Sequence, residues 1–400
     1  MVTQDQNLHA REPKTSVEQR ILETAIDLFS RNWYGTVSIA EICRKAGLSN
    51  GVFYRYFANK EAIFRVILEQ VLDLIKAQVE AIPKNDPGTP ASLRRFATAI
   101  MAIPEHRKDL ISIFREGQYR FLEYERRLVA IYIRGLCACL GREAGLVEYL
   151  FAFGGMRFCA VRRSLQGVPS DSESILRILE HGLFRGMVFD TAKVFEGLAT
   201  PLPLILNEDA RTRLLRAGKR LFGEKGYFAT NIHEITDVAG LSVGAFYVYF
   251  ESKENFYASL INLVGRELRS FISSNLAKGP AGAGLNRLER ELRGLWLFLA
   301  YLTMDRYCYS LVREAEFVIP DTVRDYYEAF VRGYRKNPEG NALPESGIDE
   351  STAINYLLGI AHYTGIEMIF ENSSANTRTI VETLGSYLSK GFSSILADRT

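Results

Sequence analysis

Two tyrosines and a lysine recur at one spacing, first as Tyr54, Tyr56 and Lys60 and again as Tyr247, Tyr249 and Lys253. Tyrosine hydroxyls can donate to phosphate oxygens while the rings pack on the sugars of a nucleic-acid backbone. A lysine at the start of a helix adds an ammonium beside the positive end of that helix. The spacing therefore predicts two phosphate-contacting surfaces. The alternative, in which the tyrosines pack inside their own domain, does not explain why both rings recur at the same spacing.

These residues belong to an internal repeat that covers most of the chain. Residues 47–61, GLSNGVFYRYFANKE, match residues 240–254, GLSVGAFYVYFESKE, at ten of fifteen positions with a constant offset of 193. A weaker match between residues 114–119 and 312–317 has an offset of 198. A changing offset indicates small insertions in loops, where they are best tolerated. The repeat therefore predicts two halves of one design.

The residues around each tyrosine pair predict a helix, a tight turn and a second helix. In the first unit, Ser38 caps a helix over residues 39–46, Gly47 supplies the turn, and Ser49 caps a short helix that ends near Phe57. In such a plan the second helix enters the major groove of DNA. In the second unit we expect Thr230 or Asn231 to cap the first helix, Gly240 to turn, and Ser242 to cap the second.

Both segments resemble the heads of the TetR family of transcriptional regulators, which carry a Gly-Leu/Val-Ser-x-Gly-x-Phe/Leu-Tyr-x-Tyr-Phe-x-x-Lys-Glu pattern. The resemblance implies two complete members fused head to tail, whereas the usual chain has one unit. The resemblance implies that one set of residues in each head faces DNA. These are Ser38, Ser49, Asn50, Gly51, Tyr54, Arg55, Tyr56 and Lys60, and Thr230, Asn231, Ser242, Val243, Gly244, Tyr247, Tyr249 and Lys253.

The expected fold is all-α, with two tandem units that each join a three-helix helix-turn-helix head to a helical ligand-binding and dimerisation body. Apolar residues recur at three- and four-residue intervals in almost every segment, as in amphipathic helices. Pro201 and Pro203 mark the boundary between the halves. The predicted parts are a tail (1–15), a head (16–61), a body (62–190), a linker (191–207), a second head (208–254) and a second body (255–400).

The two reading helices differ in their outward side chains. Asn50 and Arg55 can address purine edges, whereas Val243 and Val248 offer only apolar contacts such as that with a thymine methyl. We favour unlike half-sites in the DNA operator, because the phosphate-contacting set is intact in both heads. The alternative is a sensor or scaffold in which one head, more plausibly the second, no longer reads DNA.

One head reads only a few base pairs, so useful specificity needs two heads about one helical turn apart. Residues 146–165 and 172–188 of the first half, and 351–370 and 378–396 of the second, are expected to pack as four helices within one chain. Gly154, Gly155 and Gly359 permit close approach of these helices. The result would be an intrachain pseudo-dimer; the competing arrangement is a homodimer of tandem chains.

Both bodies are rich in aromatic side chains, which predicts a pocket for a small apolar or aromatic effector between helices. The alternative for each aromatic residue is an ordinary place in the core. By the resemblance, an effector would shift residues 61–79 and 254–271, which join body to head, and would relieve repression. The candidate ligand-binding residues are Phe114, Arg115, Tyr119, Phe151, Phe158, Trp296, Tyr309, Arg313, Glu316, Tyr327 and Tyr363.

Composition and missing motifs exclude several other classes. The 400 residues carry a net charge of +2 and only five cysteines, an odd number that argues against a disulfide framework. No nucleophile elbow, phosphate-binding glycine loop or metal-ligand motif occurs, so we expect no enzyme activity, no metal and no cofactor. No apolar run approaches the roughly 20 residues that span a bilayer. With no apolar signal core at its start, the chain is expected to be cytoplasmic, without a membrane partner.

Overall fold

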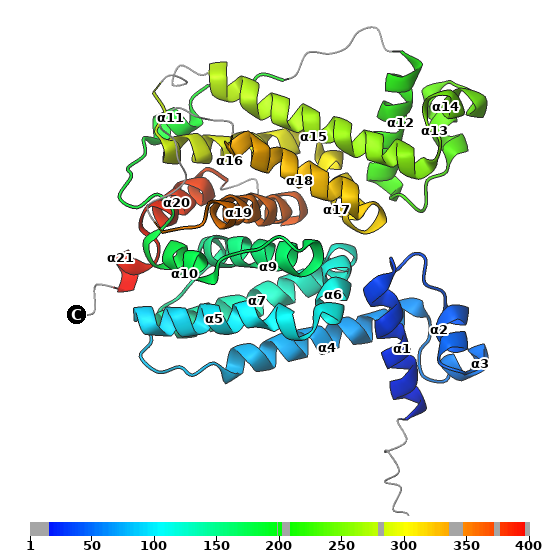
Figure 1. Cartoon of the computed structure of the whole chain (residues 1–400), viewed down its shortest axis with the longest axis horizontal. Helices are drawn as coiled ribbons and strands as arrows, with labels where there is room; N and C mark the ends of the chain where they lie inside the picture. Colours follow the sequence, from blue (N-terminus) through cyan, green and yellow to red (C-terminus); the bar gives the residue numbers. More distant parts are fainter. Residues whose placement is uncertain are drawn as a thin grey trace, which may run out of the picture.

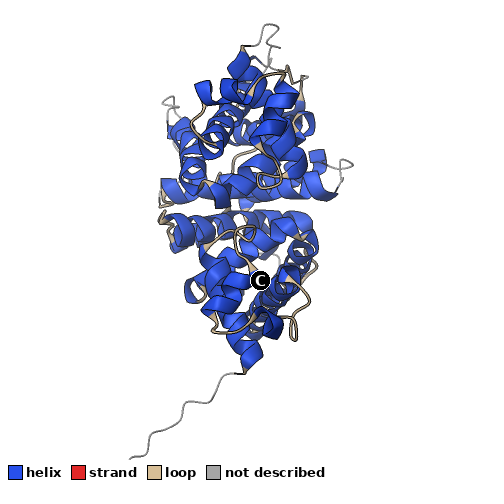
Figure 2. Cartoon of the chain, turned by 90° about the vertical axis from the view of Figure 1, so that its right-hand side faces the viewer, coloured by secondary structure: helices blue, strands red, loops and turns tan. Residues whose placement is uncertain are grey.

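The computed structural model describes residues 16–197, 199–201, 209–278, 284–335, 347–371 and 377–396. Within these ranges every regular element is a helix and no strand occurs (Figure 2). The prediction of an all-α fold is therefore confirmed.

The first half contains eleven α-helices and one π-helical turn. They are α1 (Val17–Arg31), α2 (Ile39–Lys45), α3 (Asn50–Phe53), α4 (Lys60–Ala81), α5 (Pro90–His106), α6 (Lys108–Arg120), α7 (Leu122–Leu140), α8 (Leu146–Tyr149), the π-turn η1 (Leu150–Gly154), α9 (Gly155–Gln166), α10 (Ser172–His181) and α11 (Thr191–Phe195). Helix starts follow ordinary capping chemistry. The Ser16 side chain, for example, accepts a hydrogen bond from Gln19 N at the start of α1.

The second half repeats this order. It contains α12 (Ala210–Lys225), α13 (Ile232–Ala239), α14 (Val243–Tyr249), α15 (Lys253–Lys278), α16 (Arg287–Met304), α17 (Arg306–Val318), α18 (Pro320–Arg335), α19 (Glu350–Glu371), α20 (Thr377–Lys390) and α21 (Ser393–Leu396). Helix α19 takes the place of α8, η1 and α9 together, and α20 takes that of α10. The interruption in the first half is a single π-helical turn between two α-helical segments.

The two halves lie against each other along α9 and α10 on one side and α19 and α20 on the other (Figure 1). The two heads, α1–α3 and α12–α14, project on the same side of the molecule, at the right of Figure 1. Long helices α4 and α15 run from each head along the outside of its body. The packed layer in the middle therefore sets how the two heads are placed.

Glycines make the central contact close. A Cβ atom on Gly359 of α19 would lie 2.4 Å from Gly154 O and 2.5 Å from Phe158 Cβ, and one on Gly155 would lie 2.3 Å from the Tyr356 ring. The predicted close approach at these three glycines is therefore observed between α19 and the η1–α9 segment.

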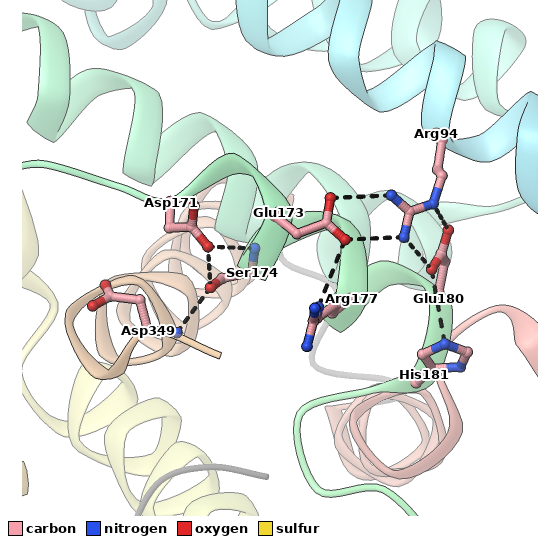
Figure 3. A network of polar contacts seen from close by, with 8 residues as sticks. All are labelled: Arg94, Asp171, Glu173, Ser174, Arg177, Glu180, His181 and Asp349. Atoms are coloured by element: carbon pink, nitrogen blue, oxygen red, sulfur yellow. Dashed lines mark hydrogen bonds and ion pairs between the residues drawn. The ribbon is translucent and has the colours of Figure 1, made fainter. Parts of the chain in front are cut away.

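Helix starts also interlock across the layer. The Asp349 backbone N–H donates to Ser174 Oγ at 2.8 Å (Figure 3), and the Asp171 backbone N–H donates to Thr352 Oγ1 at 2.8 Å. Each hydroxyl in turn donates to the aspartate that caps its own helix. The starts of α10 and α19 thus satisfy one another's backbone donors, which fixes the register between the halves.

Helix α10 is held to its own body by an arginine on α5. Arg94 contacts both Glu173 (3.1 Å) and Glu180 (2.5 Å), as Figure 3 shows. The prediction of a helix over residues 172–188 is too long, because α10 ends at His181 and Gly182 has a φ of 78°. The chain then crosses to α20, where Phe184 N donates to Leu388 O at 2.8 Å. The predicted linker begins with the short helix α11, and its residues 202–207 lie outside the described ranges.

Candidate nucleic-acid interface and ligand cavity

The first reading helix presents its predicted contact residues to the surface. Phe53 and Phe57 anchor it in the core of the head. Tyr54 and Tyr56 are 57% and 43% exposed. The other exposed residues of the predicted set here are Ser49, Asn50, Gly51 and Arg55. Regular α-helix covers only Asn50–Phe53, and the next turn is tighter, because Arg55 N donates to Val52 O and Tyr56 N to Phe53 O.

The second reading helix shows the same arrangement in a longer form. Helix α14 runs over seven residues, and the Ser242 side chain caps it by accepting a hydrogen bond from Ala245 N at 3.1 Å. In the first head, Ser49 makes no such hydrogen bond. Tyr247 and Tyr249 are 55% and 43% exposed, close to the values of their counterparts. Gly244 and Val248 are exposed as well, whereas Val243 is half-buried.

The two lysines of the repeated pattern are more enclosed than predicted. Lys60 Nζ donates to Tyr34 O and Val37 O, both at 2.8 Å, and lies 4.3 Å from the centre of the Tyr34 ring. Lys253 Nζ lies 4.1 Å from the centre of the Tyr227 ring. Burial lowers the pKa of both ammonium groups. Lys60 therefore ties the start of α4 to the head, and only its third N–H is left for a phosphate.

The predicted contact residues at the starts of α2 and α13 act mainly as helix caps. Ser38 is exposed, and its side chain accepts a hydrogen bond from Glu41 N at 3.1 Å. Asn231 and Glu234 form a reciprocal capping box at the start of α13. Thr230, in contrast, is 1% exposed and donates to Gly226 O at 2.9 Å. The prediction that Thr230 faces DNA is therefore wrong, because Asn231 takes the cap position and the threonine turns inward.

Each head is fastened to its body by one glutamate, which is buried at Glu116 and half-buried at Glu314. Glu116 on α6 accepts hydrogen bonds from the Tyr34 backbone N–H at 3.1 and 3.2 Å, and Glu314 on α17 accepts one from the Tyr227 N–H at 2.8 Å. Burial raises the pKa of Glu116 to about 7 and also raises that of Glu314. The recurrence of the two glutamates after an arginine in both halves was the signal that could have identified their shared role.

The two heads touch through aromatic residues that sequence reasoning missed. The Trp33 ring, in the loop after α1, stacks on Phe228 with centres 5.8 Å apart and also contacts Phe317 on α17 at 5.0 Å. Trp33 has no aromatic counterpart in the repeat, since position 226 is glycine. The contact restricts how far the two loops can separate.

The predicted ligand-binding residues fall into three groups. Tyr309, Arg313 and Tyr327 line a cavity of about 930 Å³ in the second body. Phe114, Arg115 and Tyr363 line a hollow of only about 60 Å³. The rest are packed elsewhere: Trp296 lies against Phe195, Phe151 against Tyr387, Phe158 against Tyr327, Tyr119 against His362 and Glu316 against Arg115.

A buried polar network connects the cavity wall to the first half. Arg115 and Glu316 form a two-pronged ion pair with both contacts at 2.8 Å, and the side chains are 5% and 6% exposed. His362 accepts or donates hydrogen bonds with Tyr119 at 3.1 Å and Tyr309 at 3.2 Å. Arg115 and Tyr119 belong to α6, the helix that also carries the head-fastening Glu116. A movement of side chains at the cavity wall can therefore be passed directly to α6 in the first half.

Each head matches a family model described as "Bacterial regulatory proteins, tetR family", over residues 21–67 and 214–260. Both heads therefore belong to the TetR family. Among curated proteins, this chain is 33% identical to the uncharacterized HTH-type transcriptional regulator YuxN of Bacillus subtilis over 108 residues. That match spans 26% of this chain and 37% of YuxN. It is 34% identical to the HTH-type transcriptional regulator HbdR of Aromatoleum sp. over 93 residues, spanning 23% and 39%.

The chain thus spans only about two fifths of the length of these curated relatives. Two solved structures each align with just under half of this chain. The transcriptional regulator FadR of Bacillus subtilis, in complex with stearoyl-CoA, covers 45% of this chain and 97% of its own at 15% identity and a TM-score of 0.38. A TetR/AcrR-family regulator of Thermobifida fusca covers the same shares at 26% identity and a TM-score of 0.32.

Among the described residues, no helix is long and apolar enough to cross a membrane. The described residues also contain no group of three or more His, Cys, Asp or Glu side chains placed to hold a metal ion. All five cysteines are free thiols, and four of them are buried.

Proposed function

We propose that the protein is a DNA-binding transcriptional regulator whose two heads act together as an intrachain pseudo-dimer. The observation that carries the proposal is the pair of exposed Tyr-x-Tyr surfaces, at Tyr54 and Tyr56 and at Tyr247 and Tyr249, on heads that project on one side of the molecule. Covalent linkage keeps the second head at a high effective concentration once the first has bound. The protein would then act in the cytoplasm as a single chain.

The operator is proposed to have unlike half-sites. Exposed Asn50 and Arg55 can donate to purine edges, whereas half-buried Val243 and exposed Val248 supply only apolar surface. The phosphate-facing tyrosines are equally exposed in both heads, which supports binding by both. The second candidate, a sensor whose second head only holds phosphates, rests on the same two valines.

Control by a small molecule is the remaining part of the proposal. Arg313 and Tyr309 line the cavity in the second body. Arg313 lies against the ring of Tyr119 on α6, and Tyr309 contacts His362, which in turn contacts Tyr119. A ligand that fits only one arrangement of these helices shifts the population of head positions. We propose that the unliganded form binds DNA and represses.

The test is selection of binding sites from random DNA by the purified full chain, followed by measurement of the mass of the complex. We expect an asymmetric site and one chain per duplex. A palindromic site bound by two chains would replace the pseudo-dimer with a homodimer of tandem chains. Recovery of only one half-site would favour the second candidate, and affinity independent of salt would contradict phosphate contact altogether.

A further inference from the structure

The two bodies have diverged at their centres. The second body encloses a cavity of about 930 Å³, whereas two hollows in the first body measure about 60 and 150 Å³. A ligand pocket for a drug-sized molecule has a volume of roughly 300–1,000 Å³. The second body therefore has room for such a molecule, and the two hollows in the first do not.

One position on the cavity wall lacks the aromatic ring that its counterpart carries in the first body. Helices α5 and α16 end 198 residues apart, at His106 and Met304, and this offset matches Phe96 to Gly294. Phe96 packs edge-on against Phe153 with ring centres 5.8 Å apart, and it would contact a Cβ on Gly135 at 2.9 Å. The counterpart of Gly135 is Gly333.

In the second body both of these positions open onto the cavity. Gly294 and Gly333 line it, and a Cβ atom added at either would meet no atom within 4 Å. The first body is filled further by Tyr132, whose ring stacks on Phe153 at 4.3 Å. The cavity is thus a feature of one half of the repeat.

The wall of the cavity carries a positive charge surplus. Four arginines line it, Arg269, Arg287, Arg290 and Arg313, against one glutamate, Glu291. Arg287 is paired with Glu291 at 2.7 Å, and Arg313 lies 3.4 Å from the centre of the Tyr119 ring. Most of the remaining wall is apolar or aromatic.

Arg269 is a half-buried arginine on this wall. Its Nη1 atom is buried and has no hydrogen-bond partner among the described residues, and burial lowers its pKa. Its guanidinium lies 5.3 Å from the centre of the Phe330 ring. A buried guanidinium nitrogen without a hydrogen-bond partner costs free energy, which an anionic ligand would recover. Arg290 adds a second buried nitrogen, Nε, without a hydrogen-bond partner on the same wall.

We propose that the effector binds in the second body alone, one molecule per chain, and that it carries an anionic group on an apolar or aromatic framework. The apolar part fills the space beside Gly294 and Gly333, and the anion pairs with Arg269, with Arg290 beside it. This inference rests on the proposed control by a small molecule, but it concerns only the chemistry and number of ligand sites.

A matched pair of dyes tests the charge preference without DNA. 8-Anilino-1-naphthalenesulfonate and N-phenyl-1-naphthylamine differ only in the sulfonate, and both fluoresce on entering an apolar site. Titration of the full chain is expected to show one site per chain and at least about tenfold tighter binding of the sulfonate, equivalent to about 1.4 kcal/mol. Dodecanoate and dodecyl phosphate are then used as competitors, and the stronger one identifies a carboxylate or a phosphate ester as the anion.

Three variants locate the site. Gly294→Phe restores the ring of the first body and is expected to abolish binding of both dyes while the melting temperature is kept. Arg269→Gln is expected to weaken the sulfonate dye about tenfold and leave the neutral dye within about twofold. Arg324→Gln, on the exposed face of α18 where it pairs with Asp321 at 3.0 Å, is the control and should change neither.

Equal affinity for the two dyes, two sites per chain, unchanged binding to Gly294→Phe or displacement by neither competitor would each overturn the inference. None of these results depends on the DNA heads. A chain that fails to bind DNA but shows the expected dye pattern would contradict the proposed function and leave this inference standing.

Discussion

Glu116 and Glu314 make the same contact in the two halves, since each carboxylate accepts the backbone N–H of the tyrosine that opens a head loop, Tyr34 or Tyr227. The equivalent contact has survived although the surrounding bodies have diverged in cavity, charge and aromatic packing. Because α6 and α17 also carry Arg115 and Glu316, one layer of side chains connects both heads with the junction between the halves.

The first prediction concerns pH. The folded-state pKa of Glu116 is about 7 against a usual 4.5, because burial disfavours the carboxylate more than Arg120, Lys60 and the Tyr34 N–H favour it. A raised pKa means that the fold binds the proton more tightly than the unfolded chain does. The stability from this group is complete below about pH 4.5 and lost as the pH rises through about 7, by an amount of order 3 kcal/mol at most.

Glu116→Gln keeps an acceptor for Tyr34 N but cannot ionise, so it should become more stable relative to the parent chain as the pH rises from 4.5 to 7.5. Urea unfolding at several pH values measures this. Glu123→Gln is the matched control, because Arg65 lowers the pKa of Glu123, so that ionisation of this group changes stability only below about pH 4.5. Parallel profiles for the parent and Glu116→Gln would show that the buried carboxyl titrates normally.

The second prediction concerns the ion pair between the halves. Arg115 and Glu316 are almost wholly buried, so removing one partner leaves an uncompensated charge. Arg115→Met or Glu316→Leu alone should cost about 3–5 kcal/mol, whereas the double variant Arg115→Met/Glu316→Leu should lose much less. A double-mutant cycle of unfolding free energies measures the difference. Additive losses would mean that the pair is not coupled in solution.

Much of the site could be predicted because its signals are local. The Tyr-x-Tyr spacing alone placed Tyr54 and Tyr247 on exposed helices. The choice between Thr230 and Asn231 was also readable, since only Asn231 stands three residues before a glutamate as a capping box requires. The turn of the chain after His181 is signalled by Gly182.

The remaining features depend on tertiary placement. Arg115 looks equally able to pair with Glu116 beside it, and only the packing of α6 on the second half brings Glu316 to it instead. Nothing in the sequence around Lys60 shows whether its ammonium contacts a phosphate or the two backbone carbonyls that it contacts in the structure. The stack of Trp33 on Phe228 breaks the repeat and so cannot be inferred from it.

The third prediction separates residues that recognise bases from residues that contact phosphates. Arg55 is exposed on the first reading helix, and its guanidinium can make two hydrogen bonds to a guanine. Arg55→Ala should reduce discrimination at one base pair of one half-site by about 1–3 kcal/mol, whereas Tyr54→Phe should weaken all sequences alike. Competition binding with single-base variants of the selected operator measures both. Val248→Ala is the control in the second head and should alter only a preference for thymine.

The last prediction concerns the junction that positions the heads. A Cβ on Gly359 would lie 2.4 Å from the backbone oxygen of Gly154, which cannot move without displacing α9 or α19. Gly359→Ala should therefore destabilise the chain by roughly 1–3 kcal/mol. It should also change the distance between spin labels placed on the two heads. Gly333→Ala meets nothing within 4 Å and should gain up to about 1 kcal/mol of helix stability with no change in that distance. If both variants leave the head separation unchanged, the spacing is set by the Trp33–Phe228 contact between the heads and not by the central helices.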